Sequence, residues 1–223
     1  MKRIVNDILY FIFVFGILLG CSKNINSPVT QQLLLGVMKN DIKTVKAALE
    51  NFADVNAKGI DGYTALMWAA NNGNIEIVKL LIKAKSNINI QNNNGMNALM
   101  IAASIGNTEM VKLLIPKISN VNSISKTGIT ALMLAASNEH VEIVKLLINA
   151  HADFNLRDKN GMTALIYASA YGRKKIVRLL ILAGADVNLK DNKNQTALFW
   201  AKINSRNERS EERRVGKECR SRW

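Results

Sequence analysis

The sequence has little of the side chains that build stapled or metal-bound folds. Its 223 residues include two cysteines, two histidines and two prolines. Cys21 and Cys219 cannot make a disulfide scaffold or a Cys-only metal site. His140 and His151 leave little material for histidine-based chemistry. An aromatic share of 6% and the scarcity of proline favour a mostly helical, repetitive protein over a β-sandwich. The hydrophobic share of 48% excludes wholesale disorder.

The charge is strongly basic, with 30 basic and 17 acidic residues and a net charge of +13. Part of this surplus lies in residues 209–223, RSEERRVGKECRSRW, with six basic and three acidic residues. This string resembles the translation of a short-read sequencing adapter, and the alternative is a natural, solvated basic tail. We therefore exclude the tail from fold reasoning and expect the natural protein to continue beyond Glu208.

The N-terminus begins with Met1-Lys2-Arg3, and an apolar run follows at residues 8–19. At about 1.5 Å per residue this run spans about 18 Å, short of the ~30 Å hydrocarbon core of a bilayer. The length is typical of a secretion signal rather than a permanent span. The run ends in Leu-Leu-Gly-Cys at residues 18–21, which resembles the lipobox of bacterial lipoproteins.

The lipobox resemblance implies that residues 1–20 are a lipoprotein signal peptide and that Cys21 carries the lipid. Palmitate and other acyl chains would then hold the protein to a bilayer. Ser22 follows the cysteine in place of aspartate, which favours the outer membrane. Residues 21–29 are predicted to be a flexible tether. The alternatives are an uncleaved signal anchor, or an ordinary signal peptide in which Cys21 is incidental.

A repeat of 33 residues runs through residues 30–208. An asparagine, an alanine-leucine pair, a glycine and a pair of leucines each recur at this interval. The asparagines, the leucines after alanine and the glycines are Asn56, Asn89, Asn122, Asn155 and Asn188; Leu66, Leu99, Leu132, Leu165 and Leu198; and Gly62, Gly95, Gly128 and Gly161. Several positions in register at one period indicate a stacked repeat architecture.

Each unit contains two short apolar-periodic segments. In the second unit they are residues 64–72, where the Thr64 hydroxyl can cap a helix, and residues 75–83, with an i, i+3, i+4 apolar stripe. Gly73 lies between them, where the chain must reverse. Helices of about nine residues are too short to be stable alone in water. We therefore expect the pairs to stack side by side, with polar hairpins such as residues 54–64 projecting between them.

These units resemble ankyrin repeats. The family pattern GxTPLHxAAxxG…VxxLLxxGADVN appears as GYTALMWAANNG…VKLLIKAKSNIN, and most fully as LLILAGADVN at residues 179–188. The resemblance covers residues 30–208, with five complete or nearly complete units and a sixth cut short. It implies an all-α ankyrin-repeat solenoid of paired antiparallel helices with projecting hairpin loops. It also implies a protein-binding scaffold rather than an enzyme.

Some residues depart from the family pattern. The glycine that ends the outer helix is kept only at Gly184; Phe52, Lys85, Ile118 and His151 occupy the other positions. A non-glycine residue in a left-handed conformation costs on the order of 1 kcal/mol. We expect these turns to be strained or differently shaped.

The middle of the repeat array carries two further departures. Pro116 falls in the last turn of the third outer helix and is expected to shorten it. Glu139 replaces the glycine between the helices of the fourth unit. The third and fourth units are therefore predicted to be softer than their neighbours.

In ankyrin proteins, partners usually dock on the hairpin tips and the adjoining ends of the inner helices. The register places Tyr63, Met96, Ile129, Met162 and Gln195 at the tips, and Asn71, Asn72, Ile105, Asn138 and Tyr171 at the helix ends. Four successive apolar or aromatic tips predict a contact stripe. The alternative is that each side chain folds back on its neighbour's hairpin. We expect packing roles for Trp68, Ile101, Leu134, Tyr167 and Trp200.

The remaining charge and chemistry point away from catalysis. Lys79, Lys112 and Lys145 recur beside Glu76, Glu109 and Glu142, which predicts charge pairs on an exposed helix face. No nucleophile, phosphate-loop or dinucleotide motif occurs, and we expect no cofactor and no metal. The two histidines are expected to have structural roles or to lie on the surface. Nucleic acid is disfavoured because aromatics do not interleave with the basic residues, whereas an anionic lipid or lipopolysaccharide patch remains an alternative.

Three functions fit these observations. The first is a lipid-anchored scaffold in the cell envelope, facing the periplasm, that binds a protein partner without catalysis. The second is a structural or protective envelope protein, immunity-like or enzyme-stabilising. The third is a cytoplasmic ankyrin effector.

Overall fold

A computed structural model describes residues 27–205 as short helices joined by turns and loops. The predictions for the signal peptide, for lipidation of Cys21, for most of the tether and for the adapter-like tail lie outside these residues. The chain divides into two compact units, Met1–Ile101 and Ala102–Trp223. Within residues 27–205, no helix combines the length and apolar character that a membrane span requires.

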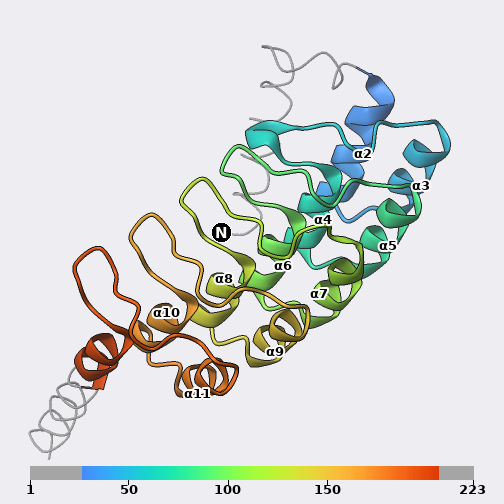
Figure 1. The fold of residues 1–223 in the computed structure, drawn as a ribbon. Helices are drawn as coiled ribbons and strands as arrows, with labels where there is room; N and C mark the ends of the chain where they lie inside the picture. The colour runs from blue at the N-terminus through green and yellow to red at the C-terminus, as the bar shows by residue number, and fades with distance from the viewer. Residues whose placement is uncertain (1–26, 206–223) are drawn as a thin grey trace, which may run out of the picture. The chain divides into compact units, whose positions relative to one another are not determined.

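In the first unit the inner helices α2 and α4 pack side by side, and the outer helices α3 and α5 do the same (Figure 1). Each inner helix also packs on the outer helix that follows it. The elements are α2 (Pro28–Met38), α3 (Ile42–Glu50), η1 (Ile60–Gly62), α4 (Ala65–Asn72) and α5 (Ile75–Lys83), followed by α6 (Ala98–Ile105), which contains the division between the units.

The second unit repeats this arrangement. The inner helices α8 and α10 pack together, and the outer helix α9 packs against both α7 and α11. The elements are α7 (Thr108–Leu114), η2 (Ile115–Lys117), α8 (Ala131–Ser137), α9 (Val141–Asn149), α10 (Ala164–Ala170) and α11 (Lys174–Leu182), and residues 197–205 are again helical. Across residues 27–205 the only extended pairing is an isolated bridge between Lys190 and Thr196. The predicted all-α fold of paired helices is confirmed.

Polar side chains start most of these helices. Thr64 Oγ1 accepts a hydrogen bond of 3.3 Å from the backbone N–H of Met67, as the sequence predicted. The same side-chain cap starts other helices at Asp41, Asn74, Asn97, Asn107, Thr130 and Thr163. Because each cap satisfies one of the free N–H groups of a first turn, it stabilises its helix by about 1 kcal/mol.

The core lies between the inner and outer helices of each pair. Ala69 and Ala70 of α4 are fully buried, and their small side chains permit close helix contact. Ile77, Val78 and Leu81 supply the buried stripe of α5. Burial of each large side chain contributes roughly 1.5 to 3 kcal/mol. Stacking therefore provides the stability that helices of this length lack alone.

The turns follow the residues that the sequence singled out. Gly73 has φ +72° and ends α4, as predicted. Phe52, Lys85 and His151 adopt φ of 59°, 62° and 59°, which is the strained left-handed region for non-glycine residues. Ile118 instead has φ −84° and ψ 135°, so its turn is differently shaped.

Pro116 shortens the third outer helix, as predicted. The α-helix stops at Leu114, and a short 3-10 turn, η2, follows. Glu139 takes the place of the glycine between α8 and α9 with φ 67°. The expected softness of this region remains a prediction.

Candidate protein-binding surface

Within residues 27–205, five hairpin loops of five residues each separate successive repeats. A backbone hydrogen bond from the N–H of the first residue to the carbonyl of the fifth closes each loop. The pairs are Gly59–Tyr63, Asn92–Met96, Ser125–Ile129, Asp158–Met162 and Asp191–Gln195, with N···O distances of 2.7 to 3.0 Å. The second and third residues of each loop therefore form its outermost part.

The first side chain of a loop holds its interior in shape. Asp158 Oδ1 accepts hydrogen bonds from the N–H groups of Asn160 at 2.9 Å and Met162 at 2.7 Å. Asn92, Ser125 and Asp191 make the equivalent pair of bonds in their own loops. These local bonds satisfy backbone donors that the turn would otherwise leave unpaired.

Neighbouring hairpins are bonded to each other within each unit. The N–H of Lys159 donates to the Thr127 carbonyl at 2.9 Å, and that of Asn192 donates to the Asn160 carbonyl at 2.9 Å. Gly161 lies where this contact is closest, with φ +76°, and an added Cβ would lie 2.9 Å from the backbone nitrogen of Asn192. Glycine is needed there for both reasons.

Four of the five predicted tip residues, Tyr63, Met96, Ile129 and Met162, occupy the closing position of their loops. Their side chains are half-buried rather than fully exposed. Tyr63, for example, lies against Trp68, with ring centroids 4.9 Å apart. The outermost exposed residues are instead their neighbours, among them Asp61, Asn93, Asn94, Lys126, Thr127, Lys159, Asn160, Asn192 and Lys193.

The predicted helix-end residues Asn71, Asn72, Ile105, Asn138 and Tyr171 are all exposed. Two of them also tie repeats together. Asn72 Nδ2 donates to the Val37 carbonyl at 3.1 Å, and Asn138 Nδ2 donates to the Ser104 carbonyl at 3.0 Å. Ile105 and Tyr171 offer apolar surface, and the ring of Tyr171 lies parallel to that of Tyr167 at 6.5 Å.

The two histidines lie at repeat junctions and turns. His140 Nε2 lies 3.1 Å from the Ser104 carbonyl, and its ring fills the space beside Gly106. His151 is exposed in the turn after α9. Within residues 27–205, no three histidine, cysteine or acidic side chains come together as a possible metal site.

Charged side chains on the helices are partly paired. Lys145 Nζ bonds Glu142 Oε1 at 2.7 Å, which is one of the in-helix pairs predicted from the repeat. Glu76, in contrast, pairs at 3.7 Å with Lys46 of the preceding outer helix. Arg173 pairs with Glu139 at 2.9 Å. The prediction of pairing within each helix therefore holds for Lys145, whereas the Glu76 pair joins two helices.

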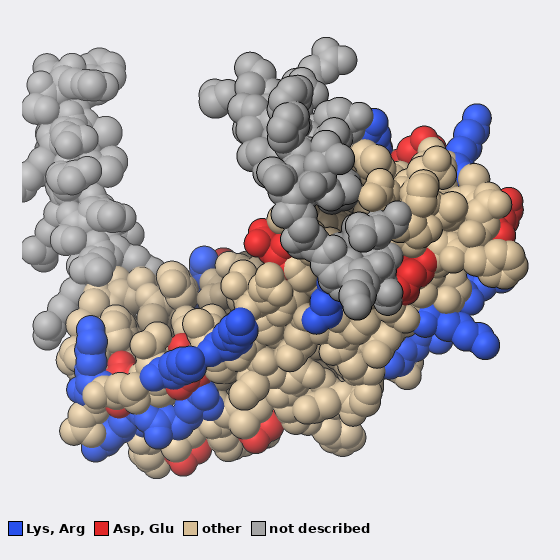
Figure 2. All heavy atoms as spheres, turned by 90° about the horizontal axis from the view of Figure 1, so that it is seen from above, with Lys and Arg blue, Asp and Glu red and all other residues tan. Residues whose placement is uncertain are grey.

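The hairpins of the second unit carry exposed lysines that, unlike several charged side chains on the helices, form no ion pair with the described residues. Lys126, Lys159 and Lys193 are exposed on three successive loops, and their ammonium groups form no ion pair or hydrogen bond with the described residues. Figure 2 shows basic side chains grouped on the surface of this unit, at the left of the view. We call these three lysines the basic tip row. A row of hairpin lysines was not predicted from the sequence, because the recurring lysines of the helices accounted for the basic surplus.

The sequence also matches one known protein family. A family model described as "Ankyrin repeats (3 copies)" matches residues 33–124, 106–191 and 150–209. No curated protein sequence matches the chain. Because the family matches cover most of the sequence and the fold is a row of helix pairs in each unit, the chain belongs to the ankyrin-repeat family.

Proposed function

We propose that this protein is a scaffold that docks an acidic protein partner on the hairpins of its second unit, while Cys21 anchors it to a membrane of the cell envelope. Ankyrin-repeat domains are typically non-catalytic protein-binding modules, which supports the binding role. Docking, the acidic character of the partner and the anchor are the proposal.

The observation that carries the docking surface is the basic tip row on hydrogen-bonded hairpins. Because Lys159 and Asn192 are tied by their backbone N–H groups to the preceding loops, the row is held in place before binding. Preorganisation lowers the entropy that association must overcome. Three unpaired ammonium groups also raise the rate at which a negatively charged partner arrives.

A protein fits this surface better than a membrane or a nucleic acid. Half-buried Ile129 and Met162 lie at the bases of the same loops, and the exposed ring of Tyr171 lies at the end of α10. An apolar anchor beside a charged rim is the usual anatomy of a protein interface. Nucleic acid would call for several aromatic platforms along the basic row.

Charge reversal tests the docking surface. The triple variant Lys126→Glu/Lys159→Glu/Lys193→Glu is compared with Lys83→Glu/Lys112→Glu/Lys175→Glu, which reverses three exposed lysines on outer helices. A photo-crosslinker at Asn160 should capture one stoichiometric partner with the unchanged chain and the helix variant, and lose it with the hairpin variant. Equal capture by both variants would contradict the proposal.

Further variants separate the apolar contribution and the competing ligands. The variant Tyr63→Ala/Met96→Ala/Ile129→Ala removes three side chains of the predicted apolar contact stripe. It is tested in the same crosslinking assay. Flotation with phosphatidylglycerol vesicles, with phosphatidylcholine vesicles as the control, measures a membrane-binding role. Flotation that depends on the basic tip row would assign the row to lipid and contradict a protein partner.

The lipid anchor rests on the sequence of residues 1–21 and is tested separately. Labelled palmitate should be incorporated into the unchanged chain and not into Cys21→Ser. Fractionation should then move Cys21→Ser from the membrane to the soluble fraction. Incorporation that survives the substitution would reject Cys21 as the lipid site, without bearing on the hairpin surface.

A further inference from the structure

Three asparagines are followed directly by glycine: Asn72, Asn94 and Asn160. In such a pair the glycine nitrogen can attack the Cγ carbon of the asparagine side chain, because glycine carries no Cβ that obstructs the approach. The three pairs share the Asn-Gly sequence but have different surroundings, so the structure decides which of them react.

Asn72 is held in an unreactive conformation. It is the last residue of α4, and its Nδ2 donates to the Val37 carbonyl of α2 at 3.1 Å. The N–H of Gly73 ends the helix by donating to the Ala70 carbonyl, also at 3.1 Å. Ring closure requires the backbone of Asn72 to rotate, and this rotation would break both the end of α4 and the contact with α2.

Asn94 and Asn160 are exposed at the third position of two hairpin loops. Neither side-chain amide forms a hydrogen bond with the described residues. The N–H groups of Gly95 and Gly161 each donate to the carbonyl of the first residue of their loop at 2.9 Å, and this bond must open before the attack. An exposed loop opens locally at a lower free energy than a packed helix.

Asn160 lies within the basic tip row. It follows Lys159 directly, and its carbonyl accepts the N–H of Asn192 on the next hairpin at 2.9 Å. A carboxylate at this point would attract the neighbouring ammonium groups and lower the positive charge that the row presents. The first hairpin carries the exposed acid Asp61 at the same position, so a hairpin of this length accommodates a carboxylate there.

We propose that Asn160 is a modification site at which deamidation weakens docking of the acidic partner; the effect on docking rests on the proposed function. The Gly161 nitrogen loses its proton to water or hydroxide and bonds to Cγ, and the bond from Cγ to Nδ2 breaks as ammonia leaves. Water then opens the cyclic imide at either carbonyl, which gives aspartate or isoaspartate. In isoaspartate the carbonyl that accepts the Asn192 N–H becomes the free carboxylate.

Peptide mapping by mass spectrometry tests the site in the folded chain, incubated in mildly alkaline buffer. Asn94 and Asn160 should deamidate at least about tenfold faster than Asn72, since one additional hydrogen bond to be opened can account for a tenfold difference. In urea, where helix and loops are lost, the three rates should converge. Equal rates for Asn72 and Asn160 in the folded chain would overturn the assignment.

Asn160→Thr is the matched variant, because Thr127 has the same position in the preceding loop. A photo-crosslinker at Thr127 captures the partner before and after incubation. Capture should fall in the unchanged chain and persist in Asn160→Thr. Both chains deamidate at Asn94, so the difference between them reports Asn160 alone. Undiminished capture by a fully deamidated chain would reject the effect on docking.

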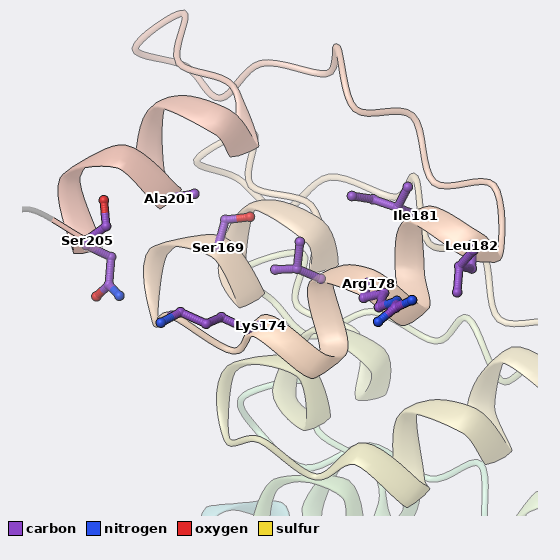
Figure 3. A pocket seen from close by; sticks show the side chains of 10 residues that line it. Ser169, Lys174, Arg178, Ile181, Leu182, Ala201 and Ser205 are labelled. Carbon is purple, nitrogen blue, oxygen red and sulfur yellow. The ribbon is translucent and has the colours of Figure 1, made fainter. Parts of the chain in front are cut away.

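Asn160→Asp places the charge of the product in the fresh chain and should weaken partner affinity about threefold, as expected for the loss of an exposed charge interaction. Arg178→Gln lowers the net charge by the same amount outside the hairpins, since Arg178 lies on α11 beside an apolar groove (Figure 3). An equal loss of affinity in both variants would assign the effect to overall charge and contradict a site in the basic tip row.

The modification site and the proposed function can fail separately. If the fresh chain captures no protein, the proposed function is wrong, and the mass measurement still decides whether Asn160 is modified. If the fresh chain captures its partner and Asn160 reacts no faster than Asn72, docking stands and the modification site is wrong.

Discussion

The hydroxyl of Tyr167 donates a hydrogen bond of 2.8 Å to Oδ2 of Asp158, the first residue of the hairpin that precedes its helix. One repeat later, Trp200 Nε1 donates to Asp191 Oδ2 at 3.0 Å. Each carboxylate therefore bonds its own loop with one oxygen and the following inner helix with the other. Hairpin and helix are fixed to each other by a single acidic side chain.

In the second repeat the indole donor is present but the carboxylate that would accept its hydrogen bond is missing. A single substitution can supply this carboxylate. Trp68 Nε1 is buried with no hydrogen-bond partner, and the position of the carboxylate is Gly59. Gly59 has φ −81°, which any residue can adopt, and an added Cβ would make ordinary contacts of 3.5 Å. Gly59→Asp should therefore raise the free energy of unfolding by about 1 kcal/mol, measured by urea denaturation. Gly59→Ala is the control, because it lowers the entropy of the unfolded chain without adding a carboxylate. If Gly59→Asp is no more stable than Gly59→Ala, the hydrogen bond from Trp68 Nε1 to the new carboxylate does not form.

Tyr167 should make the second unit sensitive to alkali. Burial, followed by the hydrogen bond and negative charge of Asp158, raises the pKa of Tyr167 above its ordinary value of 10.0. The stabilisation is fully present below about pH 10 and is lost as the pH rises through the pKa of the folded state. Tyr167→Phe should lower the free energy of unfolding by about 1 to 3 kcal/mol at neutral pH, because Asp158 loses a buried partner. The difference between the two proteins should shrink above pH 10. The difference between the ultraviolet titration curves of the unchanged chain and Tyr167→Phe gives the ionisation of Tyr167. A midpoint of this difference at or below pH 10 would contradict the prediction.

The helix pairs were predictable because they depend on short-range pattern. The cap at Thr64, the reversal at Gly73 and the shortening at Pro116 each follow from the conformational preference of one residue. The family pattern then fixed how the pairs stack. Local chemistry and register were sufficient for the fold.

The surface was less predictable because it depends on loop closure and on contacts between repeats. Met162 was expected at a tip, yet the bond from the Asp158 N–H places it at the base of the loop. The bond between Asp158 and Tyr167 joins residues nine apart, whose distance no helical or strand period determines. Glu76 likewise meets Lys46 only because successive outer helices pack side by side.

Asp191 should make the last hairpin sensitive to acid. Burial alone would raise its pKa, but hydrogen bonds from the Gln195 N–H, the Trp200 indole and the Lys193 N–H outweigh burial and lower the pKa below 3.8. This stabilisation is present above the pKa of an unfolded aspartate, about 3.9, and is lost as the pH falls through the folded pKa. Asp191→Asn should therefore cost about 1 to 2 kcal/mol at pH 7 and progressively less below pH 4. Thermal unfolding between pH 2 and 7 measures this, and a difference that does not change with pH would argue against an ionised Asp191.

The turns after the outer helices provide a matched pair for testing backbone strain. Phe52 has φ 59° and is 95% exposed, so its side chain gains little from packing while its backbone is strained. Phe52→Gly should stabilise the chain by roughly 0.5 to 1 kcal/mol. Ile118→Gly, at φ −84°, should destabilise it by a similar amount, because glycine gains only unfolded-state entropy there. Changes of the same sign in both variants would exclude backbone conformation as the cause.

The third and fourth repeats should exchange their amide hydrogens faster than the second. Pro116 ends α7 early, Glu139 holds a left-handed conformation, and His140 starts α9 with no side-chain cap. Each feature lowers the free energy of local opening, so α7 to α9 should open more often than α4 and α5. Residue-resolved hydrogen exchange by nuclear magnetic resonance measures this directly. Glu139→Gly should slow exchange in α8 and α9 while leaving α4 and α5 unchanged, because only the turn between α8 and α9 loses its strain. Equal protection of α4, α5 and α7 to α9 in the unchanged chain would show that stacking in each unit outweighs these local defects.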